Sequence, residues 1–264
     1  MTWPEIPAFE FLESPAPSHD PLAHYERAET HVTLGIPRLG SIRVTHHSIT
    51  VMAPDFQTYE EVRDRIGEWA QAQWYAAQGF RVMAGAAVGF QGEAVVIVGD
   101  PRCGASSLAY CLSESGWGLI SDGLVIVDHE GAVLAKDAAV TLDLHSVVAL
   151  SADVSRSTLK TKRERIRIET NGHPGARIGS YIFLGVNRRA EDLVLERVNF
   201  DSSTAQALDS YRIHPLLQPL RDVAPVSVAS AWLLARPLVG EHLENFDPQM
   251  LSSTLMTSFT KAAL

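Results

Sequence analysis

The segment "VVIVGDPRCGASSLAY", residues 95–110, constrains the fold of this chain more than any other. An apolar, β-branched run ends at Gly99, a second glycine follows at Gly104, and a helix-compatible run then begins. A strand that turns into a helix in this way aims backbone N–H groups and the positive helix end at one point, where phosphates bind. The GxxxxG spacing therefore predicts a phosphate loop. Its candidate contacts are Gly99, Arg102, Gly104, Ser106 and Ser107.

The residue before Ser106 does not fit an active loop of this kind. A phosphate loop carries a lysine there, which neutralises the β- and γ-phosphates, but this chain has Ala105. Ser106 does stand where a hydroxyl helps to hold Mg²⁺. The same pattern also fits a plain strand–turn–helix unit whose glycines only make the turn, so both interpretations stay open.

Composition excludes several classes of protein. With 264 residues, of which 46% are hydrophobic and 20% charged, the chain has enough apolar residues for one large domain or two small ones. A net charge of −9 disfavours a nucleic-acid partner. Cys103 and Cys111 have neither zinc-ligand spacing nor the density of a disulfide framework, which suits a cytoplasmic protein. We expect no signal peptide, because the first residues lack a basic start, and no membrane span, because prolines and polar residues interrupt the apolar runs.

The chain divides by pattern into three parts. Residues 1–28 contain five prolines, which predicts an irregular N-terminal arm. Residues 29–80 predict a small α+β region, with two or three short strands followed by a helix. Thr58, three residues before a glutamate, predicts the cap at the start of this helix, and Gly79 its end.

Residues 81–264 form the third part and contain the loop. Strands are predicted on both sides of Gly92, and a helix near residues 105–115. A hairpin is expected to turn at residues 129–131, a short helix is expected near residues 201–211, and the C-terminal third is expected to be mostly helical. Adjacent hairpins favour the α/β class, with a mixed sheet and flanking helices, over a regular βαβ winding.

Two segments on either side of the loop carry a family resemblance. These are "AGAAVGFQGEAVVIVG" before it and "GWGLISDGLVIVD" after it. With the loop, they resemble the catalytic domain of the HPr kinase/phosphorylase family and its relatives in peptide-tailoring gene clusters. The later segments "IGSYIFLGV" and "SVASAWLLARPLVGEHL" resemble the late strand and C-terminal helices of these relatives. Over about residues 80–245, the resemblance implies an HPr-kinase-like P-loop fold, ATP and magnesium as the family's cofactors, and a homo-oligomer.

Most of the catalytic residues implied by this resemblance are missing. The family's lysine falls at Ala105 and its strand histidine at Ala84. Its second aspartate falls at Gly123, which leaves Asp122 as the candidate catalytic residue. Arg102 replaces a loop glycine where a phosphate must come close. Because one lost electrostatic contact costs about 3–4 kcal/mol of transition-state stabilisation, these losses predict a degenerate phosphate loop and no efficient kinase activity.

A basic segment, "SRSTLKTKRERIRIE", follows at residues 155–169. On an acidic chain, it indicates an acidic peptide or protein ligand, although a solvated face paired with Glu164 and Glu169 is the simpler alternative. Its basic residues are Arg156, Lys160, Lys162, Arg163, Arg165 and Arg167.

Three functional hypotheses follow. The first is a cytoplasmic, non-enzymatic protein, without cofactor, that binds a peptide or protein and assists another modifying enzyme. The resemblance suggests a precursor peptide as this ligand. The second is an ATP- and magnesium-dependent kinase acting on a Ser or small-molecule hydroxyl, with Asp122 as base and Arg102 in place of the lysine. The third is a nucleotide-sensing regulator.

Overall fold

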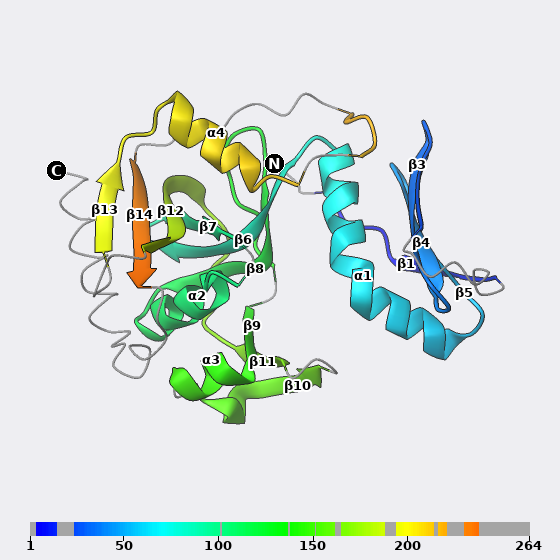
Figure 1. The fold of residues 1–264 in the computed structure, drawn as a ribbon, viewed down its shortest axis with the longest axis horizontal. Coiled ribbons are helices and arrows are strands. Elements are labelled where there is room, and N and C mark those ends of the chain that lie inside the picture. The colour runs from blue at the N-terminus through cyan, green and yellow to red at the C-terminus, as the bar shows by residue number, and fades with distance from the viewer. Residues whose placement is uncertain are drawn as a thin grey trace. The chain divides into compact units, whose positions relative to one another are not determined.

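The computed structural model describes residues 4–14, 24–100, 102–136, 138–150, 152–161, 165–187, 194–213, 216–220 and 230–237. The chain forms two compact units, each built from two stretches of sequence (Figure 1). Unit 1 comprises residues 1–82 and 213–225, and unit 2 comprises residues 83–212 and 226–264. Both contain sheets and helices, so the predicted α/β class with a mixed sheet and flanking helices is confirmed.

Unit 1 is a five-stranded sheet with one long helix, α1 (Phe56–Ala77), packed on strands β4 and β5. Alternation explains which face α1 covers, because every second residue of β4 and β5 is buried, as at Ile42 and Val51. Neighbouring strands are antiparallel except for the parallel pair β1 and β5. In spatial order, the strands are β1 (Phe9–Glu13), β5 (Ile49–Ala53), β4 (Gly40–Thr45), β3 (His31–Ile36) and β2 (His24–Arg27).

The predicted irregular arm, residues 1–28, contains both edge strands of this sheet, so that prediction was wrong. Strand β1 pairs in register with β5, as between Phe9 and Ile49. Prolines precede β1 at Pro4 and Pro7 but do not interrupt it. Proline is excluded only where a strand needs its N–H group, so a high proline count did not exclude a short edge strand.

The ends of α1 depend on one cap that was predicted and one that was not. At the start, Asp55, rather than Thr58, is the N-cap, because its carboxylate accepts the Thr58 N–H at 2.7 Å. At the end, Gly79 has φ +87° and donates its N–H to the Ala76 carbonyl, as predicted.

A returning segment near residue 216 completes unit 1. The Leu216 N–H donates to the Gln73 side chain at 2.9 Å. The Leu220 N–H donates to the carbonyl of Ala77 at 2.8 Å. These bonds join the last turns of α1 to residues more than a hundred positions later in the chain.

The main sheet of unit 2 has six strands. At its centre, β14, β12 and β7 are parallel, with antiparallel β13 and β6 beside them. Strands β6 and β7 are joined at Gln91 and Gly92, which both have positive φ, as a two-residue hairpin turn requires. The spatial order is β13 (Val194–Val198), β14 (Ser230–Pro237), β12 (Arg177–Asn187), β7 (Glu93–Gly99), β6 (Arg81–Phe90) and β8 (Gly118–Val127).

A second, three-stranded antiparallel sheet lies in the same unit (Figure 1). Helix α2 (Ala105–Glu114) shares one apolar core with both sheets, through Leu108 and Leu112 of the helix, Ile97 of the main sheet and Leu142 of the small one. The small sheet therefore helps to fix the start of α2. It contains β10 (Ser157–Thr161), β11 (Arg165–Glu169) and β9 (Ala139–Asp143), and α3 (Leu144–Ala149) and η1 (Val154–Arg156) lie between β9 and β10 in sequence.

The prediction of helices near the C-terminus was wrong for its described part, because residues 230–237 form β14. This strand lies between β12 and β13, with side chains such as Ala231 and Trp232 buried on opposite faces. A strand buried on both faces does not alternate, so its sequence lacks the usual signal. By contrast, the predicted short helix is confirmed as α4 (Ser202–Ser210), capped by Asp201.

Across the described ranges, no helix combines the length and the apolar character that a membrane crossing requires.

Candidate functional site at the start of α2

The loop after β7 forms the predicted strand–turn–helix unit. The Cys103 N–H donates to the Asp100 carbonyl at 2.9 Å and closes a tight turn. Within this turn, Arg102 has φ +68°, and Gly104 follows with φ +105° as the N-cap of α2. The local signals of the sequence therefore located both the turn and the helix start correctly.

The two glycines of the motif have different structural reasons. At Gly99, an added Cβ would lie 2.6 Å from the Cys103 sulfur and 2.9 Å from the Leu184 carbonyl oxygen. At Gly104, an added Cβ would meet nothing within 4 Å, but the positive φ favours glycine. Gly99 is thus required by packing and Gly104 by backbone conformation, without any need for a ligand.

Arg102 has a left-handed backbone conformation, with φ +68°. A left-handed conformation costs a non-glycine residue about 1–2 kcal/mol. Its side chain is exposed, so no internal packing of that side chain offsets the cost. Pro101 has no N–H, and the Cys103 N–H is already bonded within the turn. The loop therefore offers a phosphate fewer donors than a regular phosphate loop does.

Ser106 and Asp122, separated by 16 positions in sequence, are in direct contact. The Ser106 hydroxyl donates to Oδ1 of Asp122 at 2.7 Å. The other oxygen of the carboxylate, Oδ2, accepts the backbone N–H of Thr141 at 2.9 Å. Asp122 thus joins α2, β8 and β9 through two hydrogen bonds.

Ser107 links the first turn of α2 to α3. Its hydroxyl donates to the Ser146 hydroxyl at 3.3 Å. Ser146 lies in the first turn of α3, where its N–H donates to the capping carboxylate of Asp143 at 2.7 Å. Neither Ser146 nor Thr141 was identified from the sequence, because no motif spacing connects them to the loop.

A tyrosine beside the loop was also missed. Burial raises the pKa of Tyr211 above its usual range, and the nearby Asp100 carboxylate and Cys103 raise it further. The Tyr211 carbonyl accepts the N–H of Ala84, the residue where the resembling family has its histidine. Because the phenol stays protonated at neutral pH, it is a neutral hydroxyl close enough to Asp100 and Cys103 for their charges to affect its pKa.

The structure describes only part of the basic segment. Lys162 and Arg163 lie outside the described residues, and Arg156 and Lys160 are placed by backbone alone, in η1 and β10.

The two arginines of β11 are described in full. Arg165 is exposed and lies opposite Asp143 across the β9–β11 pair. Arg167 is partly exposed and lies opposite Thr141, whose N–H contacts Asp122. Strand β11 of the basic segment therefore lies beside β9, the strand whose Thr141 N–H bonds to Asp122.

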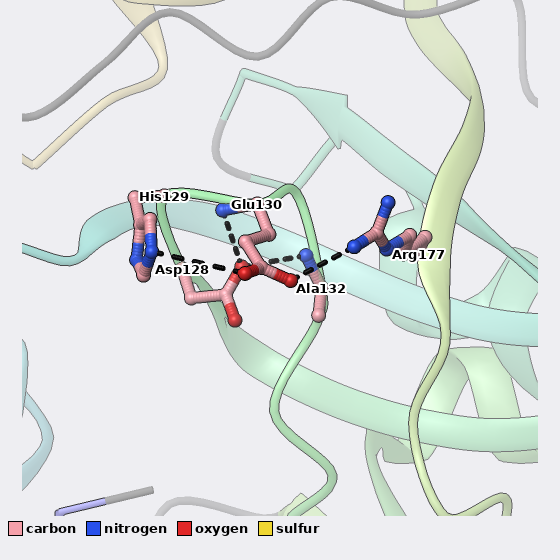
Figure 2. Close-up of polar contacts among 5 residues, drawn as sticks. All are labelled: Asp128, His129, Glu130, Ala132 and Arg177. Carbon is pink, nitrogen blue, oxygen red and sulfur yellow. Dashed lines mark hydrogen bonds and ion pairs between the residues drawn. The ribbon is translucent and has the colours of Figure 1, made fainter. Parts of the chain in front are cut away.

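An acidic turn after β8, at the predicted hairpin position, has a structural explanation (Figure 2). Oδ1 of the buried Asp128 accepts the N–H groups of Glu130 and Ala132, both at 2.8 Å. The Glu130 carboxylate accepts a hydrogen bond from Arg177 at 2.8 Å and lies 4.0 Å from His129. These contacts hold the turn against the start of β12.

No group of three or more His, Cys, Asp or Glu side chains suited to a metal occurs in the described ranges.

We expect the two cysteines to differ sharply in reactivity. Burial raises the pKa of Cys111 to about 12, whereas Cys103 is partly exposed in the loop. In the native protein at neutral pH, the Cys111 thiol therefore stays protonated, and only the thiolate reacts. A thiol-reactive chromophore should therefore label one cysteine rapidly and the second only after unfolding. The Cys103→Ala variant should lose the rapid phase, and two rapid phases in the native protein would contradict this assignment.

Comparisons with known proteins give distant matches of fold among solved structures. No family model and no curated protein matches the chain. Among solved structures, the chain is similar to the Hpr(Ser) kinase/phosphatase from Coxiella burnetii, over 68% of this chain and 91% of that one. The similarity is distant. At 12% identity and a TM-score of 0.36, it transfers neither an activity nor a residue role to this chain.

Proposed function

We propose that this chain is a non-enzymatic binding protein that holds a peptide or protein partner while another enzyme acts on it. The observation that supports this proposal is the condition of the loop. Ala105 contributes no positive charge, and the Cys103 N–H is bonded to Asp100 within the turn. Phosphoryl transfer depends on charge neutralisation and on donors aimed at the phosphates, and this loop lacks part of both.

Magnesium fits the site better than a nucleotide triphosphate does. Ser106 and Asp122 offer hydroxyl and carboxylate oxygens, the donors that Mg²⁺ prefers, at 2.7 Å from each other. Ala105 supplies no cation, and a proline at position 101 has no N–H to donate to a phosphate. The loop thus fits a bound triphosphate less well than it fits the metal ion alone.

The same pair of residues favours a second candidate, a kinase or nucleotide sensor. Ser106 and Asp122 correspond to the residues that hold Mg²⁺ in phosphate-loop enzymes, and here they are in contact. In this case, Asp122 would act as the base and the exposed Arg102 would supply the positive charge. The two proposals differ in whether ATP is turned over.

We expect no turnover of Mg·ATP above the protein-free background, and none in Ala105→Lys. The added lysine would restore one charge, but Arg102, Pro101 and Gly123 would remain. The measurement is phosphate release, with calorimetric titration of Mg·ATP in parallel. Turnover that Asp122→Asn abolishes would overturn the non-enzymatic proposal in favour of the kinase. Binding without turnover would instead support the nucleotide sensor.

The acidic character of the proposed partner is inferred from the basic segment, residues 155–169. Arg165 and Arg167 alternate with the buried Ile166 and Ile168, so both arginines lie on the face of β11 away from the core. In sequence, residues 156–167 contain six Lys or Arg and one Glu, and such a segment in an acidic chain favours an acidic partner. A precursor peptide and self-association belong to this proposal through the resemblance described above. A cytoplasmic location belongs to it because two cysteines do not make a disulfide framework.

A further inference from the structure

Three exposed apolar side chains, called here the β1 surface, gather where β1 meets the start of α1. Phe11 is 40% exposed, Leu12 49% and Phe56 64%. The Phe11 ring lies edge-on to the Phe56 ring, with ring centroids 6.2 Å apart, and to the ring of the buried Tyr59, at 5.4 Å. Phe56 in turn stacks on Tyr59 at 5.2 Å. A single exposed apolar residue needs no explanation, but this grouping does.

Strand β1 presents this surface from the edge of a sheet. It ends the strand order of unit 1, so no described strand lies on its outer side. The Ser14 N–H donates to the last carbonyl of β5 at 3.0 Å, and backbone groups alternate in direction along a strand. Those of Phe11 and Glu13 therefore point away from β5. The carbonyl of Phe9, the next outward residue, accepts the Tyr59 hydroxyl at 3.2 Å, so the open edge begins at Phe11. Open backbone groups of this kind pair with an added, extended segment.

The charge of the elements that carry this surface is strongly negative. Residues 4–14 and 55–66 contain seven Asp or Glu and two Arg, so their net charge is −5. Both arginines lie beside acids of their own helix. Arg63 contacts Glu60 and lies 3.6 Å from Asp64, and Arg65 lies 2.6 Å from Glu61. These ion pairs leave the acids of β1 uncompensated by either arginine.

Three exposed acids adjoin the β1 surface in sequence, namely Glu10, Glu13 and Asp55. Glu10 accepts a hydrogen bond from a neutral hydroxyl group of β5 at 3.2 Å. The hydrogen bond from the Thr58 N–H lowers the pKa of Asp55, so this carboxylate is charged at neutral pH. The exposed Arg38 lies in the turn between β3 and β4, two strands away from β1. An apolar surface with this acidic border is complementary to a ligand that is apolar and basic.

We infer that the β1 surface docks an extended, basic segment of a partner protein that also carries large apolar side chains. The segment pairs with the open edge at Phe11 and Glu13. Phe11 and Leu12 point to opposite faces of β1, so alternate side chains of the segment contact one or the other, and its Lys or Arg side chains face the three acids. The surface belongs to unit 1 and shares no residue with the basic segment of the proposed function, so the inference stands independently of that proposal.

The test uses the full chain and three fluorescent synthetic peptides of equal length. One alternates Lys with Leu, one Lys with Ser, and one Glu with Leu. Fluorescence anisotropy should show that the Lys–Leu peptide binds at least about tenfold more tightly than the Lys–Ser peptide. Its binding should weaken between about 0.1 M and about 1 M NaCl, where the Debye length falls from about 10 Å to about 3 Å.

Serine substitutions isolate the apolar contribution. Leu12→Ser combined with Phe56→Ser should weaken binding of the Lys–Leu peptide about tenfold and leave binding of the Lys–Ser peptide unchanged. Leu12→Ser alone should act in the same direction and serves if the double variant fails to fold, which circular dichroism shows. Val148→Ser, at a 77% exposed residue of unit 2, is the matched control and should bind as the wild type does.

A second pair of variants isolates the charged contribution. Glu10→Gln combined with Glu13→Gln should flatten the salt dependence of Lys–Leu binding, because it removes two carboxylates beside the surface. Glu114→Gln combined with Glu196→Gln removes two exposed acids of unit 2 and is the control for the change in net charge. This control should keep the salt dependence of the wild type.

The outcomes distinguish the inference from the proposed function. If the Lys–Leu peptide does not bind, or binds the β1-surface variants as it binds the wild type, the inference is overturned. If the chain elutes as a dimer that Phe56→Ser converts to a monomer, a second copy covers the surface and the inference is also overturned. The Glu–Leu peptide carries the charge proposed for the partner of the basic segment. The β1-surface variants should leave its binding unchanged, and its failure to bind the wild type would count against the proposed function alone.

Discussion

Replacing Asp122 with alanine is expected to lower the free energy of unfolding by about 2–4 kcal/mol. The substitution leaves the Ser106 hydroxyl and the Thr141 N–H without their acceptor, and a hydrogen bond to a charged group contributes about 1.5–3 kcal/mol. The partial exposure of Asp122 keeps the total below the sum of two such bonds. Chemical denaturation followed by circular dichroism measures the loss.

Two matched variants show whether the carboxylate acts through both bonds. Asp122→Asn keeps one acceptor oxygen, so it should destabilise the protein less than Asp122→Ala does. Ser106→Ala removes only the bond to the hydroxyl and should also cost less than Asp122→Ala. An unchanged unfolding midpoint in Asp122→Ala would show that the residue is not a structural link, and would strengthen the case for a catalytic carboxylate.

Replacing Gly99 with alanine should destabilise the protein by about 2–3 kcal/mol, because the site has no room for a methyl group. The added Cβ would lie 2.6 Å from the Cys103 sulfur and 2.9 Å from both the Cβ and the carbonyl oxygen of Leu184. The sulfur can shift, but the Leu184 backbone belongs to a central strand of the sheet. Thermal or chemical unfolding measures this cost.

Gly104→Ala and Cys103→Ala are the controls for this prediction. An alanine at position 104 meets no atom within 4 Å and pays only for its positive φ, about 1–2 kcal/mol. Adding Cys103→Ala to Gly99→Ala should recover part of the loss and leave the clash with Leu184. If Gly99→Ala is neutral, packing is not the reason for the first glycine of the motif.

Local signals predicted much of unit 2 and failed where the environment of a segment decides its structure. The turn at Gly92 and the helix after Gly104 depend on residues within a few positions of each other, and both were found. Strand β14 is buried on both faces, so its apolar run resembles a helix segment as much as a strand. The alternation of Arg165, Ile166, Arg167 and Ile168 was a strand signal that the charge of the segment obscured.

Some residues of the candidate site were predicted from the sequence, and others come near the loop only through tertiary packing. The family resemblance put Ser106 and Asp122 in one site, and they are hydrogen-bonded. Three further residues lie near the loop, namely Thr141, Ser146 and Tyr211. Each is at least 19 positions in sequence from the residue it contacts, and these separations follow no repeated spacing. Such contacts arise from tertiary packing, so a single sequence does not reveal them.

The interleaving of the two units affects the order in which the chain acquires structure during synthesis. The sheet and α1 of unit 1 leave the ribosome early, but the bonds from Leu216 and Leu220 to α1 must wait until residues 83–212 have emerged. Unit 2 waits even longer, because β14 fills the place between β12 and β13. Until residues 216–237 have emerged, unit 1 therefore lacks these contacts to α1 and unit 2 lacks a strand of its main sheet. Unpaired strand edges in such partly folded states favour aggregation.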